Sequence, residues 1–327
     1  MGEGNTPLVE SARVGPMLGL RHLYFKLETG NPTGSCKDRF AAAEVQRLAE
    51  LGRGSCVSIS SGNTGAALAA YCARAGLRCA IVVNPATPAA RLTQIQGYGA
   101  RLLALPNFAT DAAVTRRALE TLENGPVSFA ISSYRYCAEG MAGMESIGAE
   151  IRAQCPEGPH HVFVPVGGGG LLVAVARGLG ASGRVHAVQP AGCPTLVGAF
   201  DRGDERIVTV QSTTRIAALS VPFDMDASLA LRSMRERGGI GIAVSDEEIW
   251  EAQRQLMVLE GIFCEPAGAA ALAGLKRAAR RGAVSTEQVI VCVVTGHGFK
   301  DPESASAFSS RHPMTIVTLE NLAGAIV

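Results

Sequence analysis

Short β-branched segments alternate with alanine-rich segments along most of this 327-residue chain, and this alternation restricts the fold more than any other feature. Apolar residues recur at spacings of three and four in the alanine-rich segments, which indicates helices. The intervening runs are almost continuously apolar, as strands are when both faces of a parallel sheet are covered. The pattern predicts an α/β fold of doubly wound parallel sheets, and the length favours two lobes.

The elements can be placed by residue number. Strands are predicted at His22–Leu27, Cys56–Ser60, Cys79–Val83, Arg101–Leu105, Val127–Ile131, Val162–Val166, Arg184–Gln189 and Val289–Thr295. Helices are predicted to begin at Asp38, Thr64, Ala89, Asp111, Met141, Leu171, Asp246 and Pro266.

Composition narrows the classes of partner. Hydrophobic residues make up 47% of the chain, charged residues 18% and aromatic residues 5%, with a formal net charge of +1. Such a chain offers neither a positive field for nucleic acid or anionic lipid nor a rich surface for base stacking. The longest uncharged apolar stretch, Val162–Ala176, contains four consecutive glycines and is too short to cross a membrane. We expect a small-molecule partner or a second copy of the chain, with no nucleic acid and no membrane.

The cysteines and histidines show no metal-site spacing. Nine cysteines are present, none of them in a Cys-x-x-Cys pair. Cys72, Cys79 and Cys292 lie in apolar runs, where reduced thiols pack as small hydrophobic side chains, so a reducing cytoplasm is expected. The adjacent His160 and His161 lack spaced partners. No metal is predicted, and both histidines are expected at the surface.

Three junctions have the same design, in which a strand ends, a turn rich in Gly, Ser, Thr or Asn follows, and a helix with small residues begins. Their sequences are SISSGNTGAALAAYCARAG, VFVPVGGGGLLVAVARG and VVTGHGFKDP. In open α/β sheets ligands bind beyond the carboxyl ends of strands, where helix amino termini present free N–H groups. We therefore expect the chemistry at these junctions.

Gly167, Gly168, Gly169 and Gly170 follow a predicted strand and open a helix. Four residues without side chains let backbone N–H groups surround an anion, and the helix dipole adds a favourable potential. This predicts a phosphate cup, although a tight turn without a ligand would have the same sequence. The spacing matches neither the dinucleotide-binding fingerprint nor a P-loop.

The turn that contains Ser61, Gly62, Asn63 and Thr64 is rich in hydrogen-bond donors and lies at a predicted helix amino terminus. Its hydroxyl and N–H groups are suited to a carboxylate, and Asn63 to a ring oxygen; the alternative is a set of ordinary helix caps. Thr295 ends the last predicted strand, where its hydroxyl can donate to a pyridine-type nitrogen. We interpret the nearby His297, between two glycines, as structural.

Lys37 stands within GNPTGSCKDRF, where Pro and Gly direct the backbone. A lysine amine becomes nucleophilic when it is desolvated, and beside a phosphate cup it can form a Schiff base with an aldehyde cofactor. Taken alone, Lys37 is most simply a solvated lysine at the start of a helix. The three neighbouring turns favour the reactive role.

These motifs carry a family resemblance. NPTGSCKDR, SSGNTG, PVGGGGL and TGHGFKDP, in this order, closely resemble the fold type II pyridoxal-phosphate (PLP) enzymes of the tryptophan synthase β superfamily, and the likeness runs from GNTPLVE to about Pro302. GIFCEPAGAAALAGL followed by VVTGHGFKDP is most similar to threonine synthases.

The resemblance implies roles for individual residues. Lys37 would carry PLP as a Schiff base and move the substrate Cα proton. Asn63 would contact the ring hydroxyl, Gly167–Gly170 the phosphate and Thr295 the pyridine nitrogen, while Ser61, Gly62, Asn63 and Thr64 would bind the substrate carboxylate. A hydroxyl at the pyridine nitrogen leaves the ring a mild electron sink, which favours elimination or replacement chemistry.

The resemblance also implies an architecture. Residues 1–37 and 140–327 would form a large cofactor-binding lobe and residues 38–139 a small mobile lobe, with PLP in the cleft between them. A homodimer is expected on the same basis.

The substrate stays open at this point. A PLP-dependent lyase of amino-acid biosynthesis is expected, with threonine-synthase-like γ-replacement on O-phosphohomoserine as the first hypothesis. Threonine synthases typically have an arginine two residues before an EG pair, where this chain has Cys137, and Arg135 lies two positions earlier. Serine/threonine dehydratase and β-replacement synthase are therefore alternatives, and a non-catalytic phosphate-ligand binding protein is the hypothesis outside enzymes.

Overall fold

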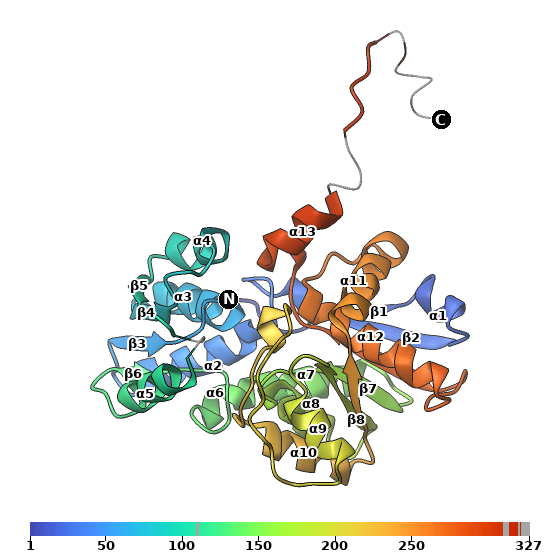
Figure 1. The fold of residues 1–327 in the computed structure, drawn as a ribbon, viewed down its shortest axis with the longest axis horizontal. Coiled ribbons are helices and arrows are strands. Elements are labelled where there is room, and N and C mark those ends of the chain that lie inside the picture. Colours follow the sequence, from blue (N-terminus) through green and yellow to red (C-terminus); the bar gives the residue numbers. More distant parts are fainter. Residues whose placement is uncertain (109–110, 310–313, 320, 322–327) are drawn as a thin grey trace.

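The chain folds around two separate β-sheets, as a computed structural model shows (Figure 1). The structure describes residues 1–108, 111–309, 314–319 and 321. The six-stranded sheet has the order β1-β2-β10-β7-β8-β9 and the four-stranded sheet the order β5-β4-β3-β6. All neighbouring strands are parallel except β1 and β2, which are antiparallel.

The strands have the following bounds: β1 Leu8–Glu10, β2 His22–Leu27, β3 Ser55–Ser58, β4 Arg78–Val83, β5 Arg101–Ala104, β6 Ser128–Phe129, β7 His161–Pro165, β8 Arg184–Pro190, β9 Gly241–Val244 and β10 Val289–Val294. The α-helices are α1 Val14–Met17, α2 Lys37–Glu50, α3 Asn63–Ala75, α4 Ala89–Gly97, α5 Ala112–Glu123, α6 Ala138–Ala142, α7 Ser146–Gln154, α8 Gly170–Leu179, α9 Thr195–Asp201, α10 Ala227–Glu236, α11 Asp246–Glu260, α12 Pro266–Arg280 and α13 Pro302–Ser309. Short 3-10 helices are η1 Glu28–Gly30, η2 Gly143–Glu145, η3 Ala217–Leu219 and η4 Gly298–Lys300.

The predicted α/β fold with parallel sheets is confirmed, and each predicted strand overlaps an observed one. The large sheet is covered on both faces, because alternate residues of β10 belong to different hydrophobic clusters. Val291 and Val293 pack in the cluster that contains α8, whereas Ile290 and Cys292 pack in the cluster that contains α12. This two-sided burial explains why β10 is apolar at every position.

Two strands were not predicted. β1 has three residues and β9 has four. Both lie at the edges of the large sheet, where pairing with one neighbour defines them.

The surface assignment is wrong for His161, which is 1% exposed, while His160 is exposed. His161 begins β7, and its Nδ1 lies 2.8 Å from His186 Nε2 on the neighbouring strand β8. The partner is 25 residues away along the chain, which is why spacing did not reveal it. Burial lowers the pKa of both imidazoles, that of His186 to about 3, so the pair is neutral near pH 7.

The four-stranded sheet is built from residues 55–129 and lies beside α3, α4 and α5, away from the large sheet with α8 to α12 (Figure 1). One hydrophobic cluster nevertheless runs from α2 and α3 to α7 and α8. Among the described residues, no helix is long and apolar enough to cross a membrane.

Helices α7 and α8 approach closely through glycines. A Cβ on Gly178 of α8 would lie 1.8 Å from Glu145 O and 2.9 Å from Ala149 N, and a Cβ on Gly148 of α7 would lie 2.2 Å from Val175 O. Backbone atoms cannot move aside as the end of a flexible side chain can. The two helices therefore pack at this distance only with glycine at the crossing.

We predict that Gly178→Ala lowers the free energy of unfolding by about 1–3 kcal/mol, the usual effect of overpacking. Gly97→Ala is the matched control, because Gly97 is also helical but a Cβ there meets nothing within 4 Å. Its stability should stay equal or rise by less than about 1 kcal/mol. Thermal and urea unfolding measure both; equal midpoints for the two variants would contradict the close crossing.

Candidate active site

The loop before Lys37 is fixed by the first turn of the helix that Lys37 begins. Asp38, buried in α2, accepts hydrogen bonds from Thr33 N at 2.8 Å and Thr33 Oγ1 at 2.7 Å. Gly34 has a φ of +87°, a conformation that L side chains rarely adopt. The Pro and Gly residues of this loop thus shape a turn that sets where the helix, and with it Lys37, begins.

The same loop is joined to the end of β10 by backbone hydrogen bonds. Cys36 N donates to Thr295 O at 2.9 Å, and His297 N donates to Gly34 O at 2.9 Å. Lys37 is half-buried, and its Nζ lies 3.6 Å from Cys36 Sγ. The start of α2 and the residue after β10, distant in sequence, are therefore neighbours.

Asn63 and Thr295 meet at one carboxylate, that of Glu265. Asn63 Nδ2 donates to Glu265 Oε1 at 2.8 Å and to Oε2 at 3.1 Å, and Thr295 Oγ1 lies 3.4 Å from Oε1. Glu265 is 5% exposed and stands directly before α12, whose first residue is Pro266. The sequence analysis assigned Glu265 no role, although it lies in the EPAG motif. The feature that could have indicated a role is a carboxylate at the start of an apolar helix.

Charges of both signs surround this carboxylate. Burial raises the pKa of Glu265, while the charge of Lys300, the hydrogen bond from Asn63 and the charge of Lys37 oppose that rise. Burial lowers the pKa of Lys300, whose Nζ donates to Gln94 Oε1 at 2.6 Å. Two amines and one carboxyl group thus share a partly dry region, an arrangement suited to holding and moving a proton.

The turn before α3 does not cap its helix with a side chain. The N-cap residue is Gly62, which has no side chain to cap the helix and whose N–H donates to Ser60 Oγ at 3.3 Å. Asn63 reaches Glu265 instead, and Thr64 Oγ1 lies 2.9 Å from Ser132 Oγ. The Asn63 and Thr64 side chains thus contact other segments of the chain and do not cap α3. Gly65, which follows Thr64, lets the turn close, since a Cβ there would lie 1.9 Å from Ser60 O.

The glycine turn follows β7 and leads into α8. Gly169 has a φ of +103°, and a Cβ there would lie 2.8 Å from Asp226 O. Asp226 N in turn donates to Gly168 O at 2.8 Å. A Cβ on Gly170 would lie 2.8 Å from Asp226 Oδ2. The turn keeps its shape only with glycine at these positions, as a backbone cradle for an anion requires.

A polar segment connects the glycine turn to the turn before α3. The Asp226 carboxylate accepts from Ser133 Oγ at 2.9 Å and from Tyr134 N at 3.0 Å. The adjacent Ser132 contacts Thr64, and its carbonyl oxygen would lie 3.5 Å from a Cβ on Gly170. Asp226 and Ser132 were also missed, because their roles depend on contacts between distant segments.

Arg135 and Cys137, which were singled out in the sequence, lie outside the group of residues that meet at Glu265 and Asp226. Arg135 is exposed, and its guanidinium carbon lies 5.4 Å from the centre of the Tyr136 ring. Cys137 is buried, and its Sγ accepts from Ile131 N at 3.4 Å. His297 Nδ1 accepts from Phe299 N at 3.3 Å at the start of η4, which fits the structural interpretation.

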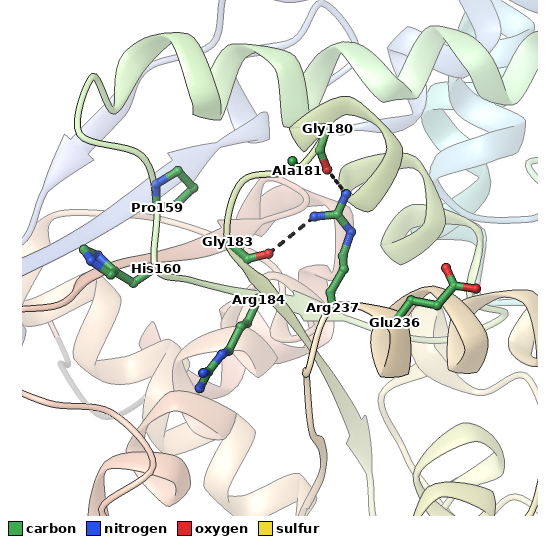
Figure 2. Close-up of a pocket in the computed structure, with 8 residues that line it drawn as sticks. All are labelled: Pro159, His160, Gly180, Ala181, Gly183, Arg184, Glu236 and Arg237. Carbon is green, nitrogen blue, oxygen red and sulfur yellow. Dashed lines mark hydrogen bonds between the residues drawn. The ribbon is translucent and has the colours of Figure 1, made fainter.

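A surface cavity of about 630 Å³ lies elsewhere (Figure 2). It is lined by His160 and Arg184, at the amino ends of β7 and β8, and by Arg237, which donates to the carbonyl oxygens of Gly180 and Gly183. The glycine turn follows the carboxyl end of β7, so it lies at the other end of this strand from the cavity. The cavity is therefore no part of the candidate active site.

The convergent residues fit PLP by their chemistry. The glycine cradle at the start of α8 suits its phosphate, the Lys37 amine suits its aldehyde, and the Asn63 and Thr295 side chains are polar partners for its ring. Their elements meet through the backbone pairing at Thr295, the carboxylate of Glu265 and the Ser132–Ser133 segment.

Comparison with known protein families also indicates a PLP enzyme. The family described as pyridoxal-phosphate dependent enzyme matches residues 1–296. The chain belongs to this family and is a PLP-dependent enzyme.

The chain is also similar to individual proteins and solved structures. The chain is 35% identical over 315 residues to the threonine synthase of Methanosarcina acetivorans, covering 92% of this chain and 76% of that protein. Among solved structures, threonine deaminase isoform 2 from Solanum lycopersicum has a TM-score of 0.79 at 21% identity, covering 94% and 88% of the two chains, a likeness of fold. The serine racemase from Dictyostelium discoideum has a TM-score of 0.74 at 25% identity, covering 90% and 92%.

We predict that Gly169→Ala weakens PLP binding at least about tenfold, because the methyl group would displace the turn from Asp226 and distort the cradle. To measure the affinity, PLP is removed from the protein, and the apo-protein is titrated with PLP while visible absorption is recorded. Gly158→Ala is the matched control: Gly158 also has a positive φ, +77°, but a Cβ there meets nothing within 4 Å.

The control variant should lose about 1 kcal/mol of stability through backbone strain and bind PLP as the wild type does. Equal PLP affinity in Gly169→Ala and the wild type would remove the phosphate from this turn.

Proposed function

We propose that this enzyme catalyses γ-replacement, converting O-phosphohomoserine and water to threonine and phosphate. The observation that carries the proposal is the meeting of Asn63 and Thr295 at Glu265, with the Lys37 loop paired to Thr295 through Cys36 N, in a chain 35% identical to a threonine synthase over most of its length. A lyase of this kind belongs to amino-acid biosynthesis.

Lys37 is the proposed catalytic residue. Its Nζ would hold PLP covalently, and the same amine would accept and return the substrate Cα proton. The bound cofactor supplies an electron sink for the carbanionic character at the substrate carbon. Glu265 and Lys300 form the charged surroundings of this amine, and the loop closed by Asp38 aims it.

Asn63 is proposed to contact the ring hydroxyl and Thr295 the pyridine nitrogen, with Glu265 positioning the Asn63 side chain. Gly167–Gly170 are proposed to hold the phosphate with backbone N–H groups and the amino terminus of α8. A neutral hydroxyl at the ring nitrogen does not supply a proton, so elimination and replacement compete well against transamination.

The substrate carboxylate is proposed to bind at Ser61, Gly62, Asn63 and Thr64. The support is the start of α3, which has no capping side chain and therefore leaves backbone N–H groups for an anion. Thr64, held by Ser132, fixes the turn on the side of the glycine cradle.

We also propose that residues 38–139 form a small lobe that moves against a large lobe of residues 1–37 and 140–327. The four-stranded sheet lies entirely within the small lobe. Two contacts of α4 with the large lobe would break on opening: Arg91 to Asp301 at 3.3 Å and Gln94 to Lys300 at 2.6 Å. Closure would exclude water from the reacting groups.

A dehydratase is the second candidate, with β-replacement sharing its first half-reaction. The observation that favours it is Cys137, a buried thiol where threonine synthases typically have arginine, together with the outward position of Arg135. A dianionic leaving group is best held by bidentate arginine. Serine and threonine need no such partner, because the group that leaves from their side chains is water.

We also propose that the enzyme works in a reducing cytoplasm and forms a homodimer. The nine cysteines are all free, as in a reducing compartment. The homodimer stays a prediction from the family resemblance.

The substrate assay offers O-phospho-L-homoserine, L-threonine, L-serine and O-acetyl-L-serine separately to the PLP-loaded enzyme and identifies the products. We expect equal amounts of threonine and inorganic phosphate from the first compound. Lys37→Ala is the control and should give neither. If the enzyme makes 2-oxobutanoate or pyruvate from threonine or serine and releases no phosphate, the dehydratase proposal replaces this one.

A further inference from the structure

Three buried cysteines meet in the core of the four-stranded sheet. Cys56 of β3 and Cys79 of β4 are direct partners in the parallel register, and Cys72 lies on α3, which packs over this sheet. Cys56 Sγ is 3.3 Å from Cys72 Sγ and 3.9 Å from Cys79 Sγ. Their exposed fractions are 1%, 9% and 0% for Cys56, Cys79 and Cys72.

The sulfur positions match three-coordinate binding of a single ion. All three sulfur atoms lie within 4.8 Å of one another, and within the described part of the chain no other group of three His, Cys, Asp or Glu ligands is this compact. Three sulfur atoms at about 2.3 Å from a central ion lie about 4 Å apart. The side chains therefore need only small shifts to bind one.

The surroundings restrict the kind of ion. The three cysteines belong to the apolar cluster that also contains Leu68, Ala69 and Ile81. No fourth His, Cys, Asp or Glu ligand joins them among the described residues, whereas structural zinc sites have four ligands. Burial of net charge in such a place is costly. Three thiolates leave a net charge of −2 around a monovalent ion and −1 around a divalent ion, but no charge around a trivalent one.

We propose that Cys56, Cys72 and Cys79 form a binding site for trivalent arsenic. Arsenous acid exchanges its three As–O bonds for three As–S bonds, and the three thiol protons leave with the three hydroxyl groups as water. Nothing is oxidised or reduced, and the product is neutral. The bound atom joins α3 to β3 and β4 in the core of the four-stranded sheet.

The thiols differ in exposure, since Cys79 is the most exposed of the three. Cys79 therefore forms the first bond, and the other two thiols complete the site from within the core.

The test incubates the reduced, PLP-loaded enzyme with sodium arsenite, desalts it and measures arsenic per chain by elemental mass spectrometry. We expect one arsenic atom per chain. Cys79→Ala and Cys72→Ala should each weaken retention by more than the roughly 10–100-fold that loss of an outer hydrogen-bond partner costs a metal site. Two variants are used so that one misfolded protein does not decide the result.

Cys292→Ala is the matched control, since Cys292 is equally buried but lies in β10 outside the cluster, and it should retain arsenic as the wild type does. A parallel incubation with Zn²⁺ should leave less metal bound than arsenite does. The proposal is overturned if the wild type retains no arsenic, if the folded cluster variants retain it fully, or if Zn²⁺ is held as tightly.

Discussion

The backbone pairing between the Lys37 loop and the end of β10 is the contact on which the candidate site depends. Cys36 N to Thr295 O and His297 N to Gly34 O join the start of α2 to the turn after the central strand. Asp38 closes the loop, and β10 is paired with a strand on each side. The position of one amine is thus determined by the large sheet.

Two buried carboxylates extend this arrangement. Glu265 gathers Asn63 and Thr295, and Asp226 holds the segment that runs from Ser133 toward Thr64 and the glycine turn. A hydrogen bond to a charged group contributes about 1.5–3 kcal/mol, and a buried donor left without a partner costs about 1–3 kcal/mol. The carboxylates therefore stabilise this arrangement of the turns over others that would leave these donors unpaired.

Much of the fold could be predicted from the sequence, because strands such as β10 are long and apolar on both faces. The glycine turn, Asn63, Thr295 and Lys37 could be selected because strand ends, helix starts and residue chemistry are local properties. Glu265 and Asp226 could not be assigned roles, since these arise from contacts between segments remote in sequence. The cluster of Cys56, Cys72 and Cys79 was missed for the same reason: its members lie on two strands and one helix, and their sequence spacing matches no metal motif.

The central claim is that the Lys37 amine carries the cofactor. The most direct measurement reduces the PLP-loaded enzyme with borohydride, digests it and locates the pyridoxyl group by peptide mass spectrometry. The account predicts the adduct on Lys37, with none formed in Lys37→Ala. An adduct on Lys300 or another side chain, or no adduct on a protein that binds PLP, would contradict it.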